Sequence, residues 1–127
     1  MLLDSNIVIY AANPASEILR HFIQQRRCAV SSITYVEVMD YRALNVQDRT
    51  YFERFFETTD VLPISDAVLR RAFTLRRRRR LKFTDAVIAA TALEHGLTLA
   101  TRNLKDFTHI TELSIVNPLV GGLSNER

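Results

Sequence analysis

The sequence has 127 residues, 47% of them hydrophobic, and a formal net charge of +3 at pH 7. A chain of this length forms one domain that buries about two thirds of the surface exposed by its unfolded form. Its apolar runs are far shorter than the roughly 20 residues of a membrane span, and its N-terminus lacks the basic leader of a signal or transit peptide. Because Cys28 is the single cysteine, an internal disulfide is excluded. We therefore expect one cytoplasmic domain over residues 1–127, with a frayed tail from about residue 120 and no membrane contact.

The basic residues are distributed unevenly along the chain. Eight of the 17 Lys and Arg residues lie between positions 70 and 82 with no acid among them, whereas the rest of the chain carries nine basic and 14 acidic residues. One interpretation is a surface that contacts nucleic acid phosphates. The other is a solvated helix end whose arginines complement the helix dipole or pair with acids elsewhere. The candidate phosphate contacts are Arg76, Arg77, Arg78, Arg79, Arg80 and Lys82.

The N-terminal segment predicts a short strand followed by a helix. Residues 1–3 are apolar and end at the polar run Asp4-Ser5-Asn6. For Asp4 the structural alternative is an N-cap of the following helix, since Asp, Ser and Asn all suit that position. An amphipathic helix is then expected over residues 17–27.

The next two elements place a second acid after a strand. Residues 29–31 predict a short buried strand, and a helix opens directly after it with Glu37 in its second turn. Glu37 also lies three residues after Thr34, which is the spacing of a capping box, so a purely structural role is the alternative. Residues 49–57 predict a further helix whose apolar bulk comes from aromatic side chains, and these suit the core or a contact between subunits.

The middle of the chain predicts an edge strand and a long helix. Residues 61–64 form the strand, and Pro63 restricts it to an edge or to its own end. Ser65 is expected to cap a helix that runs from Asp66 into the arginine run. The inward side of that helix is expected to consist of Val68, Leu69, Ala72, Phe73 and Leu75.

The segment from Lys82 to Phe107 combines a buried helix, a stop, a strand and a polar cluster. Thr84 is expected to cap the helix, and Asp85 follows where the dipole favours a carboxylate. The almost wholly apolar run after it indicates burial. A short buried strand over residues 97–100 then leads into a polar cluster of Thr101, Arg102, Asn103 and Asp106, and residues 113–116 add a last strand.

The alternation of short apolar strands with helices, without hairpin signals, predicts a parallel sheet covered by helices on both faces. In such a sheet the strand ends after Leu3, Ser31 and Ala100 lie along one edge. Carboxylates that meet there raise one another's pKa unless a cation compensates them. Oxygen ligands without clustered His or Cys select Mg²⁺ or Mn²⁺, which together with a basic face fits phosphodiester cleavage.

Four motifs follow one another in chain order: Asp4-Ser5-Asn6 after a short strand, SITYVE at residues 32–37, TDAVIAATA at residues 84–92 and TRNLKDF at residues 101–107. Together they resemble a PIN-domain ribonuclease of the VapC toxin type, from a type II toxin-antitoxin system. The resemblance covers nearly the whole chain. It implies a single PIN-like α/β/α sandwich and a Mg²⁺-dependent endoribonuclease that cuts structured RNA such as transfer RNA. It further implies inhibition by a VapB-like antitoxin and assembly as a homodimer or a toxin-antitoxin hetero-oligomer.

The resemblance also assigns roles to residues of this chain. Asp4, Glu37 and Asp85 match the acidic core of the family, and Asp106 is expected to complete the metal site because Asn103 stands where many relatives have an aspartate. The supporting residues are expected to be Ser5, Asn6, Thr101 and Asn103. The alternative function is a non-catalytic nucleic-acid-binding subunit that acts with an antitoxin on operator DNA. Asn103 keeps that alternative open, and an EDTA-sensitive RNA cleavage assay separates the two.

Overall fold

A computed structural model describes residues 1–41 and 45–119. The tail expected from about residue 120 therefore lies outside the described residues. The strands are β1 (Leu2–Leu3), β2 (Ala29–Ser31), β3 (Asp60–Leu62), β4 (Leu99–Ala100) and β5 (Ile115–Val116). The helices are α1 (Ser5–Ala11), α2 (Glu17–Gln24), α3 (Ser32–Met39), α4 (Val46–Thr58), α5 (Asp66–Arg78), α6 (Phe83–Glu94) and the short 3₁₀ helix η1 (Leu104–Asp106).

The strands form one parallel sheet in the order β3-β2-β1-β4-β5. Leu2 pairs with Ala29 on one side and with Leu99 on the other, so β1 is the central strand. The chain first winds outward from β1 through β2 to β3 and then crosses to β4, so the winding direction reverses between β1 and β4. In an open α/β sheet, this reversal is where a ligand crevice forms at the carboxyl ends of the strands. The expected parallel sheet and the edge position of β3 are confirmed.

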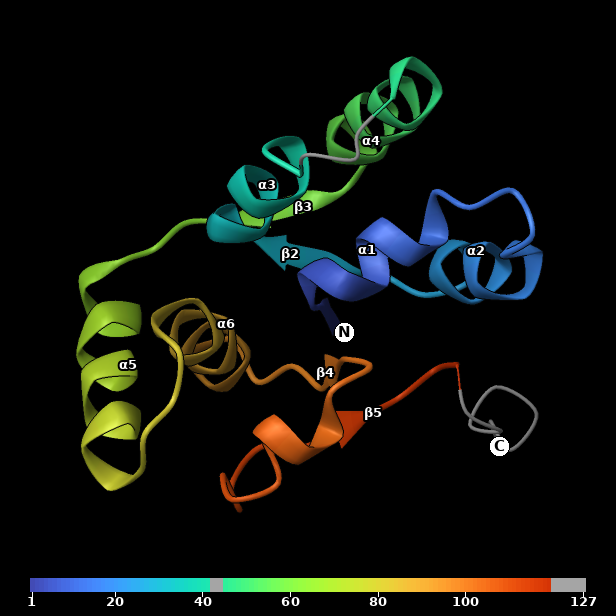
Figure 1. The fold of residues 1–127 in the computed structure, drawn as a ribbon. Coiled ribbons are helices and arrows are strands. Elements are labelled where there is room, and N and C mark those ends of the chain that lie inside the picture. Colours follow the sequence, from blue (N-terminus) through green and yellow to red (C-terminus); the bar gives the residue numbers. More distant parts are fainter. Residues whose placement is uncertain (42–44, 120–127) are drawn as a thin grey trace.

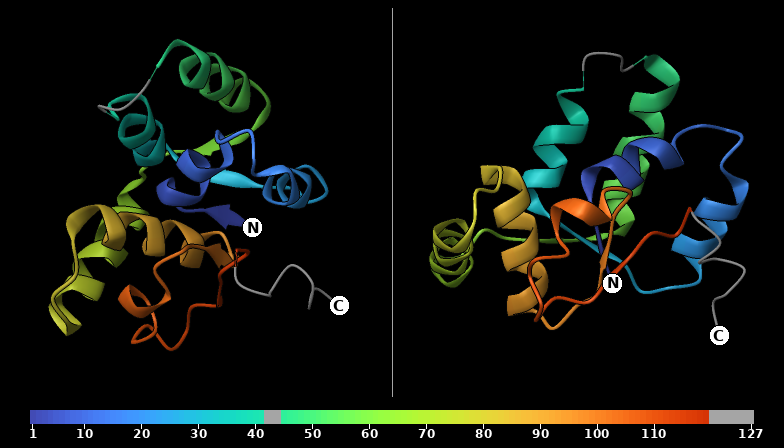
Figure 2. Two further views of the ribbon diagram at one scale, coloured as in Figure 1. Left: turned by 45° about the vertical axis from the view of Figure 1, so that its right-hand side comes forward. Right: turned by 60° about the horizontal axis from the view of Figure 1, so that its bottom comes forward.

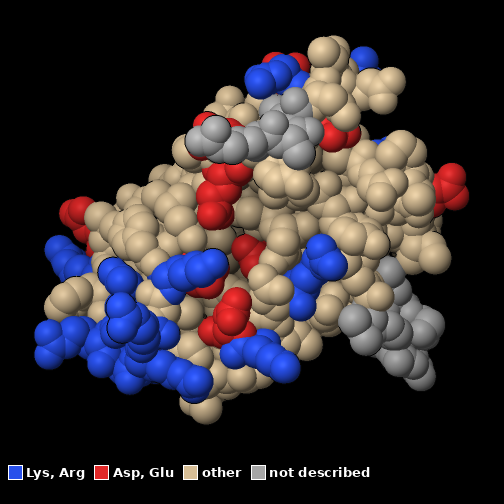
Figure 3. Space-filling view, viewed as in Figure 1, with Lys and Arg blue, Asp and Glu red and all other residues tan. Residues whose placement is uncertain are grey.

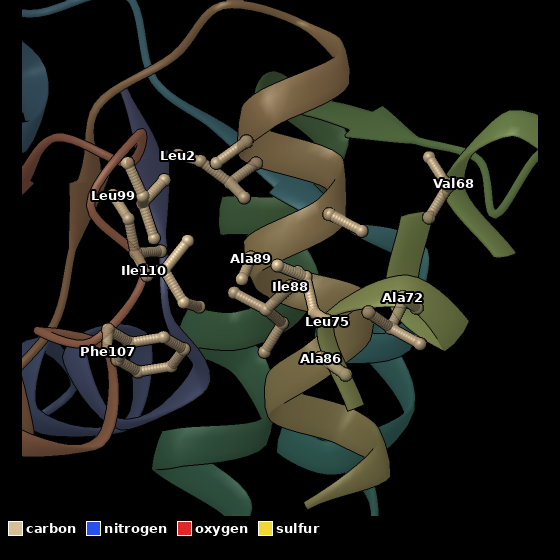
Figure 4. Packing of buried hydrophobic residues seen from close by; sticks show 14 of the residues in the cluster. Leu2, Val68, Ala72, Leu75, Ala86, Ile88, Ala89, Leu99, Phe107 and Ile110 are labelled. Carbon is tan, nitrogen blue, oxygen red and sulfur yellow. The ribbon is translucent and has the colours of Figure 1, made fainter. Parts of the chain in front are cut away.

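Helices cover both faces of the sheet (Figure 1). On one face α5 and α6 pack against Leu2 and Leu99, and the segment after η1 closes this layer through Phe107. The core around α6 is dense because Ala86, Ala89 and Ala90 present small side chains with almost no solvent exposure, which lets neighbouring elements approach closely (Figure 4). The expectation that the helix after Lys82 is buried is therefore confirmed.

The opposite face is covered by α1, α2, α3 and α4. Leu3 and Val30 point into this second cluster, since successive side chains of a strand alternate between faces. Figure 2 shows α3 and α4 side by side above the strands, and α5 packed across α6 on the other side. The aromatic core expected from α4 is present at Phe52 and Phe55, which are nearly fully buried. The α/β/α arrangement predicted from the sequence is therefore confirmed.

Several expected boundaries are corrected. The helix α4 begins at Val46 rather than residue 49, because the Asn45 side chain caps it by accepting a hydrogen bond from the Asp48 amide. In α5 the Ser65 cap is confirmed, since Ser65 Oγ accepts a hydrogen bond from the Val68 amide. Leu69 and Phe73 were expected to face inward, but they are 43% and 64% exposed because α6 covers only the face of α5 that carries Val68, Ala72 and Leu75.

Candidate active site

Asp4 lies directly after β1, and α1 starts at the next residue. Its carboxylate is nearly buried, with 5% of the residue exposed, and it accepts hydrogen bonds from three donors. The Ser5 amide donates to Oδ1 at 2.8 Å, whereas the Thr101 hydroxyl and the Asn6 side-chain amide donate to Oδ2 at 2.7 and 3.3 Å. Asp4 is therefore an N-cap, as the structural alternative required, and at the same time its Oδ2 is held by Thr101, the residue that follows β4.

Thr101 connects the carboxyl ends of β1 and β4. The Asp4 amide donates to the Ala100 carbonyl at 2.9 Å, which places the two strand ends side by side. The fully buried Thr101 hydroxyl accepts from the Asn103 amide at 3.0 Å while it donates to Asp4. This arrangement fixes the orientation of the carboxylate, because each of the three groups has a defined partner.

Glu37 is brought to the site by α3, which follows β2. The Ser5 hydroxyl donates to Glu37 Oε1 at 2.5 Å and lies 3.2 Å from the hydroxyl of the buried Thr34. The capping-box interpretation of Glu37 is wrong, because the N-cap of α3 is Ser31 and Thr34 is already inside the helix. Glu37 therefore points toward the start of α1, where it lies within electrostatic range of Asp4.

Asp85 lies in the first turn of α6, on the other layer of the fold. The expected Thr84 cap is corrected, because α6 starts at Phe83 and its N-cap is Lys82, which makes no side-chain capping bond. The pKa of Asp85 is raised from 3.8 to about 6, first by burial and then by the negative charges of Asp4 and Asp106, with Lys82 acting in the opposite direction. This repulsion indicates that the Asp85 carboxylate lies within electrostatic range of Asp4 and Asp106.

The end of η1 supplies the fourth acid, Asp106. Asp106 is exposed, and its charge contributes to the raised pKa values of both Asp4 and Asp85. Asn103 is exposed, and within the described residues its side chain makes no hydrogen bond, although its backbone amide bonds to Thr101. Asp106 therefore interacts electrostatically with Asp4 and Asp85, whereas, in the described part of the chain, Asn103 contacts the site only through its backbone amide.

Burial and mutual repulsion act together on the central carboxylate. The pKa of Asp4 is raised, first by burial and also by the charges of Glu37 and Asp106, while the hydrogen bonds from Thr101 and Ser5 lower it. Four acids that are far apart in the sequence therefore converge at the carboxyl edge of the sheet. Such crowding is costly unless a cation or proton compensates it, and it is typical of functional sites.

A basic cleft adjoins the acids on the side of α5. It has a volume of about 370 Å³, and Asp85 and Asp106 form part of its wall. The other lining residues are Arg76, Arg79, Arg80, Leu81, Lys82, Lys105 and His109. Figure 3 shows the Lys and Arg side chains gathered beside the acidic centre.

The basic residues that were grouped together in the sequence divide in the structure. Arg78 is paired with Glu112 at 2.8 Å, and Arg77 lies over the ring of the exposed Phe73 at 5.7 Å, so neither lines this cleft. Arg76 lines it while its Nε donates to the Leu81 carbonyl at 2.9 Å, which orders the turn between α5 and α6. The interpretation as a helix end that pairs with acids therefore holds for Arg78.

Sequence reasoning missed two groups at the site. Thr34 is buried beside the Ser5 hydroxyl, and His109 lines the cleft with a buried Nε2 that has no hydrogen-bond partner among the described residues. Burial and the nearby Arg79 and Arg78 lower the pKa of His109, which favours the neutral ring. The position of His109 three residues after Asp106 was the available signal, since residues at that spacing share a face of a helical turn.

The donor set fits a hard divalent cation. The four acids supply oxygen ligands, and burial together with the neighbouring negative charges raises the pKa of Asp4 and Asp85, which a bound cation would offset. Within residues 1–41 and 45–119, no three His, Cys, Asp or Glu side chains already meet closely enough to hold a metal ion by themselves. Mg²⁺ commonly keeps several waters and takes only one or two carboxylates together with substrate phosphates, so a closed cage is not required.

Comparison with known families and structures gives one consistent result. The sequence matches the PIN domain family over residues 1–113. No curated protein matches the chain. None of the helices in the described part of the chain has the length and hydrophobicity to span a bilayer.

Solved structures with this fold include several toxin-antitoxin complexes. A chain of a toxin-antitoxin complex from Klebsiella pneumoniae is 33% identical, with a TM-score of 0.77 over 92% of this chain and 96% of that chain. A chain of VapBC-1 from nontypeable Haemophilus influenzae is 26% identical, with a TM-score of 0.76 over 91% and 96% of the two chains. A chain of VapBC2 from Rickettsia felis, bound to a promoter DNA fragment, is 23% identical and shares the fold with a TM-score of 0.79 over 91% and 96%.

Proposed function

The chain belongs to the PIN domain family, and from this premise we propose that it is a Mg²⁺-dependent endoribonuclease of the VapC toxin type. The observation that carries the proposal is the meeting of Asp4, Glu37, Asp85 and Asp106 at one edge of the sheet, where burial and then the charges of the other acids raise the pKa of Asp85 to about 6. A cluster of acids beside a basic cleft suits phosphodiester hydrolysis, because the reaction needs both a cation site and a surface that accepts phosphates. The 33% identity to a chain of a toxin-antitoxin complex supports the assignment to this type.

The carboxylates divide the work according to their surroundings. Asp4 is held by three donors and would provide a fixed anchor for the cation, and Asp85 and Asp106, which line the cleft, would also hold it. Mg²⁺ or Mn²⁺ would supply charge stabilisation at the phosphate and a source of hydroxide at neutral pH. Glu37, held through Oε1 by the Ser5 hydroxyl, orients and deprotonates the attacking water with its other oxygen.

The cleft residues bind and position the RNA. Arg76, Arg79, Arg80 and Lys82 neutralise backbone phosphates beside Asp85, which favours a strand whose backbone can enter a cleft of about 370 Å³. Single-stranded loops of structured RNA such as transfer RNA fit this requirement better than a duplex, because their bases and backbone can splay apart. Ser5, Asn6 and Thr101 act by holding the carboxylates, and Asn103 supports Thr101 through its amide.

The proposed partners follow from the family and its neighbours. We infer a VapB-like antitoxin that blocks the site, and a cytoplasmic protein that assembles as a homodimer or as a toxin-antitoxin complex. The similar chain from Klebsiella pneumoniae comes from such a complex. Exposed apolar residues, including Phe73 and Phe83, are available on α5 and α6 for these contacts.

The test is cleavage of a transfer RNA pool by the purified protein with Mg²⁺, with EDTA, and with Mg²⁺ restored after EDTA. Asp4→Asn and Asp85→Asn should abolish cleavage while circular dichroism shows a folded protein. Asp66→Asn is the matched control, because Asp66 also lies in the first turn of a helix but is exposed and outside the cluster. Cleavage that survives EDTA, or that both site variants retain, would remove the proposed mechanism. Operator DNA binding without any RNA cleavage would favour the non-catalytic alternative.

A further inference from the structure

Tyr10 and Arg102 form an exposed pair beside the carboxylates. The guanidinium carbon of Arg102 lies 4.8 Å from the centroid of the Tyr10 ring, which is the geometry of a cation–π contact. Tyr10 belongs to α1 and is 39% exposed, while Arg102 follows Thr101 after β4 and is also exposed. An aromatic ring and a cation are thus presented to solvent together, although neither has a role in the site described above.

The pair is attached to the central carboxylate through Asn6. The Arg102 amide donates to Asn6 Oδ1 at 3.3 Å, and the Asn6 side-chain amide donates to Asp4 Oδ2 at 3.3 Å. On the other side of Arg102, Thr101 donates to the same Asp4 oxygen. The backbone of Arg102 is therefore held at a fixed place, and the Asn6 side chain links it to Asp4, which is the proposed anchor of the cation.

The pair and the basic cleft lie on opposite flanks of the acids. The cleft arginines come from the end of α5 and the turn that follows it, in the layer that packs on the Leu2 face of the sheet. Tyr10 comes from α1, in the layer that packs on the Leu3 face. Figure 3 shows Lys and Arg on both sides of the Asp and Glu residues at this edge. An RNA strand that runs across this edge of the sheet would contact Lys or Arg side chains on both sides of the carboxylates.

We propose that Tyr10 and Arg102 form a second nucleotide subsite, which binds the RNA on the side of the cut away from the basic cleft. The Arg102 guanidinium contacts a phosphate, and a base stacks on the exposed faces of the pair. Stacking of this kind accepts any base, so the subsite sets the position of the strand and not its sequence. The inference rests on the proposed ribonuclease function and extends it.

The competing account is a surface contact that only joins α1 to the segment after β4. Binding measurements separate the two accounts, because a merely structural pair contributes no phosphate contact and no stacking. The probe is a fluorescein-labelled oligouridylate, which is single-stranded, and its affinity is followed by fluorescence anisotropy over a series of salt concentrations. Asp85→Asn serves as the background so that the RNA stays intact.

In this background Arg102→Ala should lower the slope of log affinity against log salt by about 0.7, the value for one phosphate contact on a single strand. Tyr10→Ala should weaken binding ~5-fold or more, and Tyr10→Phe should retain the affinity because the ring remains. Arg27→Ala is the matched control, since Arg27 is exposed and lies before β2 at the opposite edge of the sheet. Thermal unfolding of each variant confirms that it is folded.

Otherwise wild-type protein that carries Tyr10→Ala or Arg102→Ala should cleave RNA with a raised KM and a nearly unchanged kcat. Affinity and salt slope equal to those of Arg27→Ala would overturn the subsite, and so would a loss confined to antitoxin binding. Failure of the wild-type protein to cleave RNA would instead remove the proposed function. Weaker oligouridylate binding by Tyr10→Ala, together with retained binding by Tyr10→Phe, supports the subsite whether or not the wild-type protein cleaves RNA.

Discussion

Replacing Asp85 with asparagine should stabilise the protein when no metal is present. Asparagine keeps the shape of the side chain but removes the charge that burial and the neighbouring acids oppose. A pKa raised from 3.8 to about 6 corresponds to about 3 kcal/mol between the protonated and ionised forms. The carboxylate is partly exposed, and solvent screening reduces the expected gain to about 1–2 kcal/mol.

The sign of the pH dependence follows from the direction of the shift. Because the folded protein holds the Asp85 proton more tightly than the unfolded chain does, the stabilisation is complete below pH 3.8 and is lost as the pH rises through about 6. The stability of the wild-type protein in EDTA should therefore fall over this window relative to Asp85→Asn. The difference between the two proteins should be largest near neutral pH and should vanish at acid pH.

Urea denaturation followed by circular dichroism in EDTA measures this difference. The control Asp66→Asn has the same substitution in the first turn of α5, and it should lose about 0.3–1 kcal/mol because an exposed acid there favours the helix dipole. Mg²⁺ at about ten times its Kd should stabilise the wild-type protein by about 1.4 kcal/mol and Asp85→Asn by less. If Asp85→Asn is as stable as the wild-type protein or less stable at neutral pH in EDTA, the inferred crowding of carboxylates is wrong.

Three other changes test the site, the cleft and the core. Thr101→Val removes a buried 2.7 Å hydrogen bond to Asp4, so it should raise the pKa of Asp4 further. It should also lower the free energy of unfolding, measured by urea denaturation, by about 1.5–3 kcal/mol, whereas Thr101→Ser should retain most of the stability. Arg80→Ala should reduce the salt dependence of oligouridylate binding, measured by fluorescence anisotropy, by about 0.7 in the slope of log affinity against log salt. Arg78→Ala should change this slope less, because Arg78 is already paired with Glu112. Ile88→Ala opens a cavity in the packed core around α6 and should lower the free energy of unfolding by about 2–5 kcal/mol.

The order of elements was predictable because local and global preferences agree in this chain. Short apolar runs alternate with helical segments, and such a pattern leaves a covered parallel sheet as the arrangement that buries both faces. Polar residues directly after strands then predict a site at the carboxyl edge. Asp4 and Thr101 illustrate this, since each follows a buried strand and the structure joins them by a hydrogen bond.

The local errors share a cause. Thr84 and Thr34 have side chains that suit an N-cap, but both lie inside their helices, since α6 starts at Phe83 and α3 at Ser32. The preceding turn or the end of the preceding strand fixes where each helix begins. Leu69 and Phe73 follow the apolar period of α5, yet they remain exposed because no described element covers that side. Propensity and periodicity describe a segment by itself, whereas packing decides which of its faces finds a partner.

By itself, the sequence determined the fold class, the family resemblance and the acids that stand at the ends of the strands, because these depend on periodicity and on residue types within short segments. Only the tertiary structure decided that Ser5 holds Glu37, that Asp106 reaches the charge of Asp85, and that the arginine run divides between a cleft and an ion pair with Glu112. The physical reason is that hydrogen bonds and charge repulsion act over a few ångströms. Distances of that size between residues far apart in the chain are set by the packing of the layers.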